Sequence, residues 1–241
     1  MSNGRKGPGT GKKRSTASSG RNLHTRVKTA KRRKTSSTRW LQRQLNDPYV
    51  AAAQKDGYRS RAAYKLIELN DRFNFLAPGI KVIDLGAAPG GWTQVVLETL
   101  GDPAAGASSA IIALDLLDVD PLPGVDIMIQ DFMADDAPKM LKSKLPGGAG
   151  LVLSDMAPAL TGHTPTDHLR IMAVVEAAYL FACEVLTPDG CFIAKVFQGG
   201  TEQELLAEMK KRFRSVKHAK PPASRAESSE VYVVAQGFRH V

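Results

Sequence analysis

Cysteine is nearly absent from this chain of 241 residues, which contains Cys183 and Cys191 and no others. Two cysteines are too few for a disulfide framework or a cysteine-rich metal site, so we expect both to serve as small apolar groups and no metal to bind. Long hydrophobic runs are also missing: none approaches the roughly 18 residues that span a bilayer, and none follows the basic start as a secretory signal would require. We therefore expect a cytoplasmic protein without a membrane partner.

Acidic residues are absent from residues 1–46, which hold 14 lysines and arginines. Because the whole chain carries a formal charge of +9, residues 47–241 carry −5. The first segment is rich in Gly, Ser and Thr, so it cannot bury enough apolar surface to offset the entropy of ordering. We expect residues 1–46 to form a disordered tail that binds RNA phosphates through counterion release, and residues 47–241 to form one domain.

The tail has two other interpretations. An organellar transit peptide also combines arginine and serine with few acids, but this segment lacks an amphipathic apolar stripe. The tail could also serve only to keep the protein in solution. No heptad pattern or large apolar patch predicts self-association, so we expect a monomer.

Short apolar runs alternate with helical patterns through the rest of the chain. Strand-like runs occupy residues 80–85, 110–115, 125–130, 151–155 and 191–197, and helical patterns occupy residues 60–73, 167–186 and 201–213. Two last runs, residues 215–220 and 230–238, are joined by a connection too short for a crossover helix, which predicts antiparallel pairing. The pattern predicts an α/β fold, with a mostly parallel seven-stranded sheet, helices on both faces and an antiparallel final strand.

A glycine-rich loop, residues 84–92 (DLGAAPGGW), follows the first predicted strand and precedes a helix. Glycine lets the backbone approach a ligand closely, and the loop has the position of a nucleotide site. Its spacing, G-x-x-x-G-G, differs from the G-x-G-x-x-G of dinucleotide loops and disfavours a dehydrogenase. At its end, Trp92 can lie against the ligand or in the core.

Two acids follow the next strands. Asp115 ends the second strand, where a carboxylate can bind both hydroxyls of a ligand ribose. Asp131 follows the third strand, where it either accepts from an exocyclic amine or only favours a turn. Both acids fit a nucleotide-like ligand at the glycine loop.

The later strands also carry polar residues at the edge where open parallel sheets bind ligands. Asp155 follows the fourth strand, Lys195 lies within the apolar fifth, and Glu230 begins the last. A buried Lys195 needs a partner, and Lys65, in the helix before the first strand, would complete a set of two ammonium groups and two carboxylates. The set predicts either a catalytic centre or a buried salt-bridge cluster.

Seven motifs in chain order resemble the FtsJ/RrmJ (RlmE) group of ribosomal RNA large-subunit 2′-O-ribose methyltransferases, over about residues 39–241. They are SRAAYKL at Ser60, VIDLGAAPGGWTQ at Val82, LDLL at Leu114, QDF at Gln130, SDMAP at Ser154, AKVFQG at Ala194 and SEVYVVAQGF at Ser229. Two features depart from the family pattern: Ala159 stands where Asn is expected, and the basic tail is longer than the family core requires.

The resemblance implies a Rossmann-like class I methyltransferase domain at residues 47–241, with S-adenosyl-L-methionine as cofactor. It implies a catalytic Lys-Asp-Lys-Glu tetrad carried by Lys65, Asp155, Lys195 and Glu230, with Lys195 central. The implied cofactor contacts are Gly90, Trp92, Asp115, Asp131 and Asp155. The implied substrate is a ribose, expected to be that of a uridine, in 23S ribosomal RNA of the large ribosomal subunit.

Several alternatives stay open from the residues alone. An enzyme acting on transfer RNA or an RNA cap, or a non-catalytic RNA-binding ribosome-assembly protein, could share these features. Lys195 could act as a base or as an electrostatic stabiliser of a developing alkoxide. Arg59, Arg61 and Arg225 are expected near the site entrance, where they would contact RNA phosphates.

Overall fold

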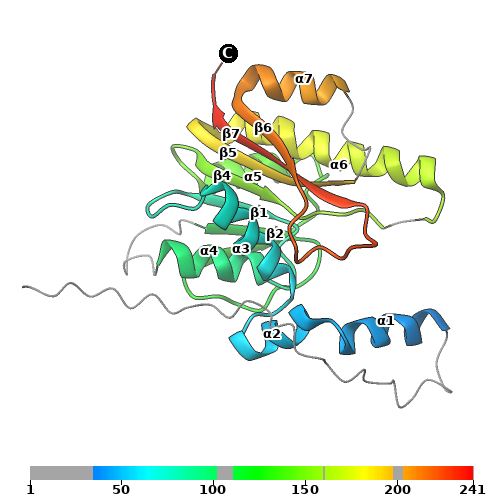
Figure 1. Ribbon diagram of the computed structural model, residues 1–241. Coiled ribbons are helices and arrows are strands. Elements are labelled where there is room, and N and C mark those ends of the chain that lie inside the picture. Colours follow the sequence, from blue (N-terminus) through cyan, green and yellow to red (C-terminus); the bar gives the residue numbers. More distant parts are fainter. Residues whose placement is uncertain (1–34, 102–110, 160, 198–202, 241) are drawn as a thin grey trace, which may run out of the picture.

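The computed structural model describes residues 35–101, 111–159, 161–197 and 203–240. Within these residues, one seven-stranded sheet with the order β3-β2-β1-β4-β5-β7-β6 forms the centre of the molecule (Figure 1). Helices cover both faces of the sheet. The α/β fold predicted from the alternation of apolar runs and helical patterns is confirmed.

Five strands form the parallel part of the sheet: β1 (Val82–Leu85), β2 (Ile111–Asp115), β3 (Val125–Ile129), β4 (Ala149–Ser154) and β5 (Leu186–Phe197). β1 lies between β2 and β4 and is buried along its whole length, as expected of an apolar strand covered on both faces. In the register of the sheet, Leu85 pairs with Leu114 on one side and with Ser154 on the other. The residues that follow these positions therefore meet at one edge.

The last two strands, β6 (Phe213–Ala219) and β7 (Glu230–Phe238), pair antiparallel with each other, as predicted. β7 lies between β5 and β6 and is antiparallel to both. Because it runs in the opposite direction, its first residues lie where the parallel strands end, and Glu230 pairs with Phe197.

The helices form two layers. α3 (Ala62–Phe73) and α4 (Gly91–Leu100) contribute Leu66 and Val95 to the hydrophobic core on one face. α5 (Ala137–Lys144), α6 (Thr164–Val185) and α7 (Gln203–Arg212) contribute Leu141, Val175 and Met209 to the core on the other. No described helix is both long and apolar enough to cross a membrane.

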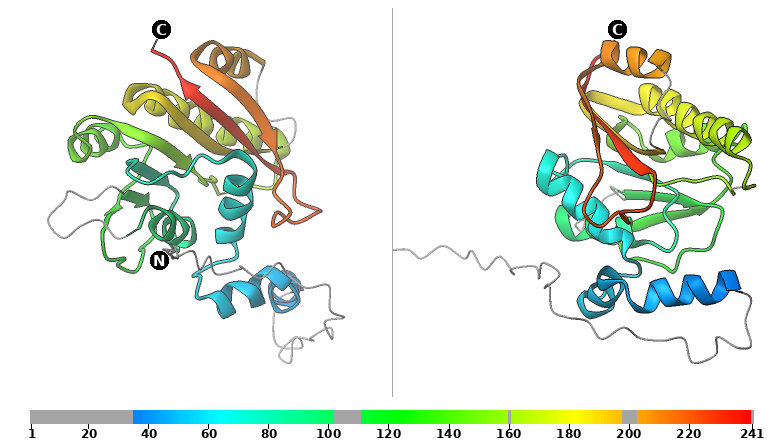
Figure 2. Two further views of the ribbon diagram at one scale, coloured as in Figure 1. Left: turned by 60° about the vertical axis from the view of Figure 1, so that its left-hand side comes forward. Right: turned by 45° about the vertical axis from the view of Figure 1, so that its right-hand side comes forward.

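Two further helices, α1 (Thr35–Leu45) and α2 (Pro48–Asp56), lie at the end of the molecule opposite α7 (Figures 1 and 2). Between them, Asp47 caps α2, because its Oδ1 accepts a hydrogen bond of 3.0 Å from the backbone N–H of Tyr49. The expectation of disorder up to residue 46 is wrong for α1, since the lysine and glycine runs end before it. The rest of the expected tail, residues 1–34, lies outside the described residues.

Other differences concern element boundaries. Neither α2 nor α5 was predicted, because neither carries a long apolar period. β5 begins at Leu186 instead of near Cys191, so residues 187–190, which separate the predicted helix from the predicted strand, belong to the strand. Asp189 adopts a left-handed φ of 66° there. The predicted helix start at residues 201–202 lies outside the described residues.

Candidate active site

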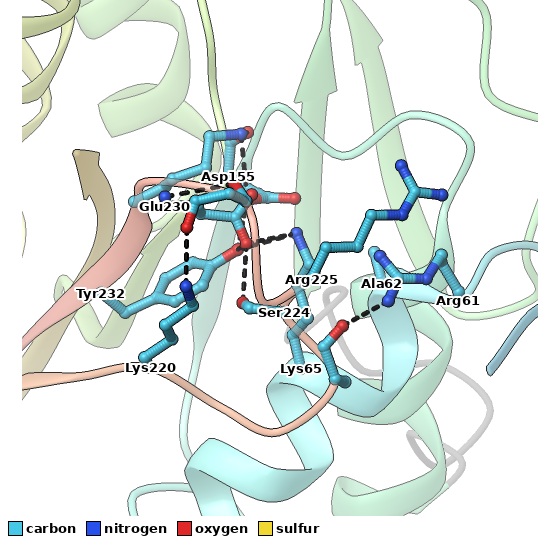
Figure 3. A network of polar contacts seen from close by, with 12 residues as sticks. Arg61, Ala62, Lys65, Asp155, Lys220, Ser224, Arg225, Glu230 and Tyr232 are labelled. Atoms are coloured by element: carbon cyan, nitrogen blue, oxygen red, sulfur yellow. Dashed lines mark hydrogen bonds and ion pairs between the residues drawn. The ribbon is translucent and has the colours of Figure 1, made fainter. Parts of the chain in front are cut away.

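The sheet register brings the predicted polar residues together at its carboxyl edge. Ser154 pairs with Ala194, so Asp155, which follows β4, is adjacent to Lys195 on β5. Lys195 in turn pairs with Tyr232, two residues after Glu230 on β7. Lys65 reaches the same place from α3, where only 8% of its surface is exposed. All four residues of the predicted tetrad therefore converge. Figure 3 shows three of them, Lys65, Asp155 and Glu230.

The four charged groups form two ion pairs. Nζ of Lys65 lies 2.7 Å from Oε1 of Glu230, and Nζ of Lys195 lies 3.1 Å from Oδ1 of Asp155. Nζ of Lys195 also donates a hydrogen bond to the backbone carbonyl oxygen of Asp155. Lys195 is 9% exposed, so a single missing partner would leave a nearly buried charge, which is strongly destabilising.

The hydroxyl of Tyr232 joins the two ion pairs. It lies 2.8 Å from Oδ1 of Asp155 and 3.3 Å from Oε1 of Glu230, and it accepts a hydrogen bond of 3.3 Å from Nζ of Lys65. Burial, followed by the charges of Asp155 and Glu230, raises the pKa of Tyr232 well above its usual value. The phenol therefore stays protonated and serves as a fixed donor between the carboxylates.

Glu230 is ionised in this arrangement. Its burial works against the charged form, but the positive charge and hydrogen bond of Lys65 outweigh burial and hold the pKa of Glu230 below its usual value. Ser224 adds to this effect, since its hydroxyl donates a hydrogen bond of 2.8 Å to Oε1 of Glu230. The site thus holds fixed carboxylates beside two nearly buried ammonium groups.

A cavity of about 420 Å³ opens beside the tetrad at the ends of β1, β2 and β4. Three of the predicted cofactor residues, Asp115, Asp131 and Asp155, line it. The carboxylate of Asp115 is held in place because its two oxygens accept hydrogen bonds of 2.8 Å from the backbone N–H groups of Ala88 and Leu117. Asp155 is shared, since it both lines the cavity and pairs with Lys195.

The glycines of the loop make room for other parts of the protein. A Cβ on Gly86 would meet the backbone nitrogen of Met156 at 2.8 Å, and Gly86 itself lines the cavity. Gly90 has a φ of +104°, and a Cβ added there would meet the guanidinium of Arg59 at 2.7 Å. A Cβ added to Gly91 would meet the hydroxyl of Ser60 at 2.5 Å. The glycines were expected to allow close approach of a ligand, whereas Gly90 and Gly91 make room for the side chains of Arg59 and Ser60.

Trp92 lies in the core and its side chain does not line the cavity. The indole is 3% exposed, packs 5.6 Å from the ring of Tyr232, and donates a hydrogen bond of 2.8 Å to the carbonyl of Ala62. Gly90 is also missing from the cavity wall. α4 turns the indole of Trp92 inward, where it packs against Tyr232. The cofactor contacts expected of Gly90 and Trp92 stay predictions.

Arg59 has a structural position instead of the expected one at the RNA entrance. Its guanidinium donates hydrogen bonds to the carbonyls of Pro89, Asp120 and Pro121, at 3.4, 2.7 and 3.1 Å. These bonds tie the glycine loop to the segment after β2. Nothing in the sequence motif distinguishes this role from that of a surface arginine.

Sequence reasoning also missed Tyr232 and Ser224. Tyr232 could have been found, because it lies two residues after Glu230 on a strand and so faces the same side of the sheet. Ser224 lies in the irregular connection before β7, where no periodicity predicts side-chain direction.

Comparison with known proteins identifies the group to which this chain belongs. The model of the FtsJ-like methyltransferases matches residues 58–238. The chain belongs to the FtsJ-like methyltransferase family. The ribosomal RNA large subunit methyltransferase E of Paramagnetospirillum magneticum is 60% identical over 223 residues, which cover 92% of this chain and 91% of that protein.

Two further relatives match this FtsJ-like methyltransferase over most of their own length. The protein of the same name from Rhodospirillum rubrum is 55% identical over 241 residues, covering 99% of this chain and 90% of that one. A crystal structure of a ribosomal RNA methyltransferase from Plasmodium falciparum has 31% identity and a TM-score of 0.65, covering 75% of this chain and 98% of that one. The fold and the enzyme class predicted from the sequence are both confirmed.

Proposed function

We propose that this FtsJ-like methyltransferase transfers a methyl group from S-adenosyl-L-methionine to a ribose 2′-hydroxyl, that of a uridine, in 23S ribosomal RNA of the large ribosomal subunit. One observation carries the proposal: Asp155 belongs at once to a cavity of cofactor size and to a tetrad of alternating charge. A methyl donor and a hydroxyl acceptor must meet in line, and a shared residue brings their two sites into contact.

The cavity fits the proposed cofactor. Its volume of about 420 Å³ lies within the range of ordinary small-molecule sites. Asp115, fixed by two backbone N–H groups, would accept from the ribose hydroxyls, and Asp131 would accept from the adenine amine. When bound, the cofactor supplies an electrophilic methyl group on a positively charged sulfur. The remaining chemistry falls to the residues around the acceptor oxygen.

Lys195 acts on the acceptor hydroxyl. Two of its N–H groups are directed to Asp155, one to the carboxylate and one to the backbone carbonyl. An ammonium group has three donors, so the third would be directed to the 2′-oxygen. It would stabilise the negative charge that develops as the hydroxyl, in bonding to the transferred methyl group, releases its proton to water. Lys65, Glu230 and Tyr232 fix this geometry through their shared hydrogen bonds.

Replacement of Lys195 tests this role. In single-turnover methylation of large subunits from a strain that lacks the enzyme, we expect Lys195→Met to lower the rate at least a hundredfold, with cofactor affinity within about threefold of wild type. Lys195→Arg keeps the charge but has a different donor geometry, so we expect it to fail as well.

The matched control is Lys217→Met, an exposed lysine on β6 outside the tetrad, which should keep the wild-type rate. A Lys195→Arg protein that retains the rate of the wild type would contradict the assignment.

The relatives named above support ribosomal RNA as the substrate. Mapping of ribose methylation in all RNA from a deletion strain tests this choice, and we expect one 2′-O-methyl group to be lost from 23S RNA. Loss from a transfer RNA instead would identify the alternative substrate. Binding of cofactor without any loss of methylation would indicate a non-catalytic assembly protein. A ribosomal substrate would place the reaction in the cytoplasm, and we propose that the protein acts there as a monomer.

A further inference from the structure

A second cavity, of about 440 Å³, lies between the α1–α2 junction and the connection from β6 to β7. Its walls include Gln42 and Arg43 from α1, Asn46 just after it, residues 47–49 at the start of α2, Arg61 before α3, and residues 222 and 224–227 of the connection. Neither the cofactor nor the tetrad accounts for it. It joins elements that are far apart in the sequence.

Arginines dominate the charge of this cavity. Arg43, Arg61 and Arg225 line it, against two acids. One of these acids, Asp47, is shared, since its Oδ2 lies 2.8 Å from Nε of Arg61 and 3.3 Å from a terminal nitrogen of Arg225. A single carboxylate between two guanidinium groups leaves a surplus positive charge. Such an arrangement favours an anion, and a guanidinium fork matches a phosphate in particular.

Arg61 and Arg225 are held in place by these contacts, which use only some of their N–H donors. Arg61 donates a hydrogen bond of 2.5 Å to the carbonyl of Ala223, and its side chain is 16% exposed. Arg225 makes only long contacts to Asp47, of 3.3 and 3.4 Å, and its side chain is 26% exposed. Since each guanidinium has five N–H donors, both can bind a ligand without losing these contacts.

The cavity adjoins the tetrad through two short connections. Arg61 precedes Lys65 by four residues, which is about one helical turn along α3. Ser224 lines the cavity and donates a hydrogen bond of 2.8 Å to Glu230. Figure 3 shows Arg61 and Arg225 beside Lys65 and the Ser224–Glu230 pair. A strand of RNA whose ribose lies at Lys195 would therefore continue past Lys65 into this cavity.

We propose that this cavity binds a phosphodiester group of the acceptor RNA strand, next to the methylated nucleotide. Arg43 and Arg225 contact the phosphate, while Arg61 and Asp47 hold Arg225 and the connection in place. The site rests on the proposed function, because it places the RNA strand relative to the tetrad. In this proposal, α1 forms one wall of the RNA-binding site.

The test uses the full chain with Arg43→Gln and Arg225→Gln, each of which removes one arginine charge. With large subunits from a strain lacking the enzyme, the substrate concentration for half-maximal methylation should rise about tenfold for each variant. The rate at saturating substrate and the cofactor affinity should stay within about twofold. With a single-stranded RNA oligonucleotide, the slope of log affinity against log salt should become shallower by about 0.7.

Arg214→Gln is the matched control, because Arg214 is an exposed arginine at the far end of β6 that pairs with Asp189. It should match the wild type in each measurement. Wild-type salt slopes in both variants would overturn the proposal, and so would a lower saturating rate with unchanged half-saturation. An effect seen with subunits but not with the oligonucleotide would assign the cavity to a ribosomal protein and also overturn it. If the wild type does not methylate subunits, the proposed function fails instead, while the salt slopes still test the cavity.

Discussion

Asp84 is the most deeply buried charged residue next to the cofactor cavity. It lies in β1, two residues before Gly86, and is 0% exposed. Its Oδ2 accepts a hydrogen bond of 2.7 Å from the hydroxyl of Thr93, and its Oδ1 has no partner among the described residues. Burial, and then the negative charges of Asp155 and Asp115, raise the pKa of Asp84 to about 7, although Thr93 works against this. Near neutral pH, this carboxyl therefore gains or loses a proton.

The raised pKa of Asp84 predicts a pH-dependent stability. Between the usual pKa of about 4 and the folded value of about 7, the folded state binds more protons than the unfolded state, so the wild type loses stability as the pH rises. Asp84→Asn removes the titration. Relative to this variant, the free energy of unfolding of the wild type should fall by up to about 1.4 kcal/mol per pH unit between pH 5 and 7.

Urea denaturation of both proteins at several pH values measures this difference. Asp135→Asn, at an exposed site, is the control and should give a curve parallel to the wild type. Parallel curves for Asp84→Asn as well would mean that Asp84 stays charged in the folded protein.

At this same scale, the tetrad could be predicted from the sequence, whereas the roles of Arg59 and Ser224 could not. Lys195 stands out because it interrupts an apolar strand, and topology alone places Glu230 beside it. Arg59 carries no such signal, because its role depends on carbonyl groups in two loops whose positions follow from the whole fold. For Trp92 the sequence left the ligand and the core open, because a helix start gives no information about which way the indole turns.

At the scale of elements, the start of α4 packs against the segment before α3. Gly90 is the N-cap of α4, with a left-handed φ of +104°, and Arg59 lies directly over it. A side chain at Gly90 would therefore be strained by its backbone and would also displace the guanidinium that fixes the loop.

We predict that Gly90→Ala destabilises the protein by about 2 to 4 kcal/mol, through backbone strain and the displaced guanidinium together, and weakens cofactor binding. Gly101→Ala is the matched control, because Gly101 has a φ of +80° but nothing within 4 Å of an added Cβ, so it carries only the backbone strain. Denaturation curves give the change in stability, and cofactor titration gives the change in cofactor affinity. In an Arg59→Ala background, the difference between the two glycine variants should shrink. An equal loss in both backgrounds would show that Arg59 does not determine the effect.

Element identity followed from the sequence wherever an apolar run had a clear period. Each of the seven predicted strands came from such a run, and the structure contains all seven. α1 was hidden because the composition of residues 1–46 is dominated by the lysine, glycine and serine residues before it. α2 begins with a capping Asp47 and a proline, a helix-start signal that is clear only once the boundary of the basic segment is known.

At the scale of the whole molecule, charge is divided along the chain. Residues 1–34 carry 12 of the 33 lysines and arginines, and they precede every described element. Deletion of residues 1–34 should therefore leave the urea midpoint unchanged while it weakens RNA binding at least tenfold. The slope of log affinity against log salt should become shallower by several units. A wild-type slope in the truncated protein would exclude this segment from RNA binding.

The position of β7 has a consequence for how the enzyme is made. A ribosome synthesises the chain from its first residue, so every residue that lines the cofactor cavity is translated before Glu230 and Tyr232. β6 cannot join the sheet until β7 has inserted between it and β5. During translation, all residues that line the proposed methyl-donor pocket are therefore synthesised before the residues of β7 that complete the tetrad. The tetrad is complete only when β7, which carries Glu230, has joined the sheet.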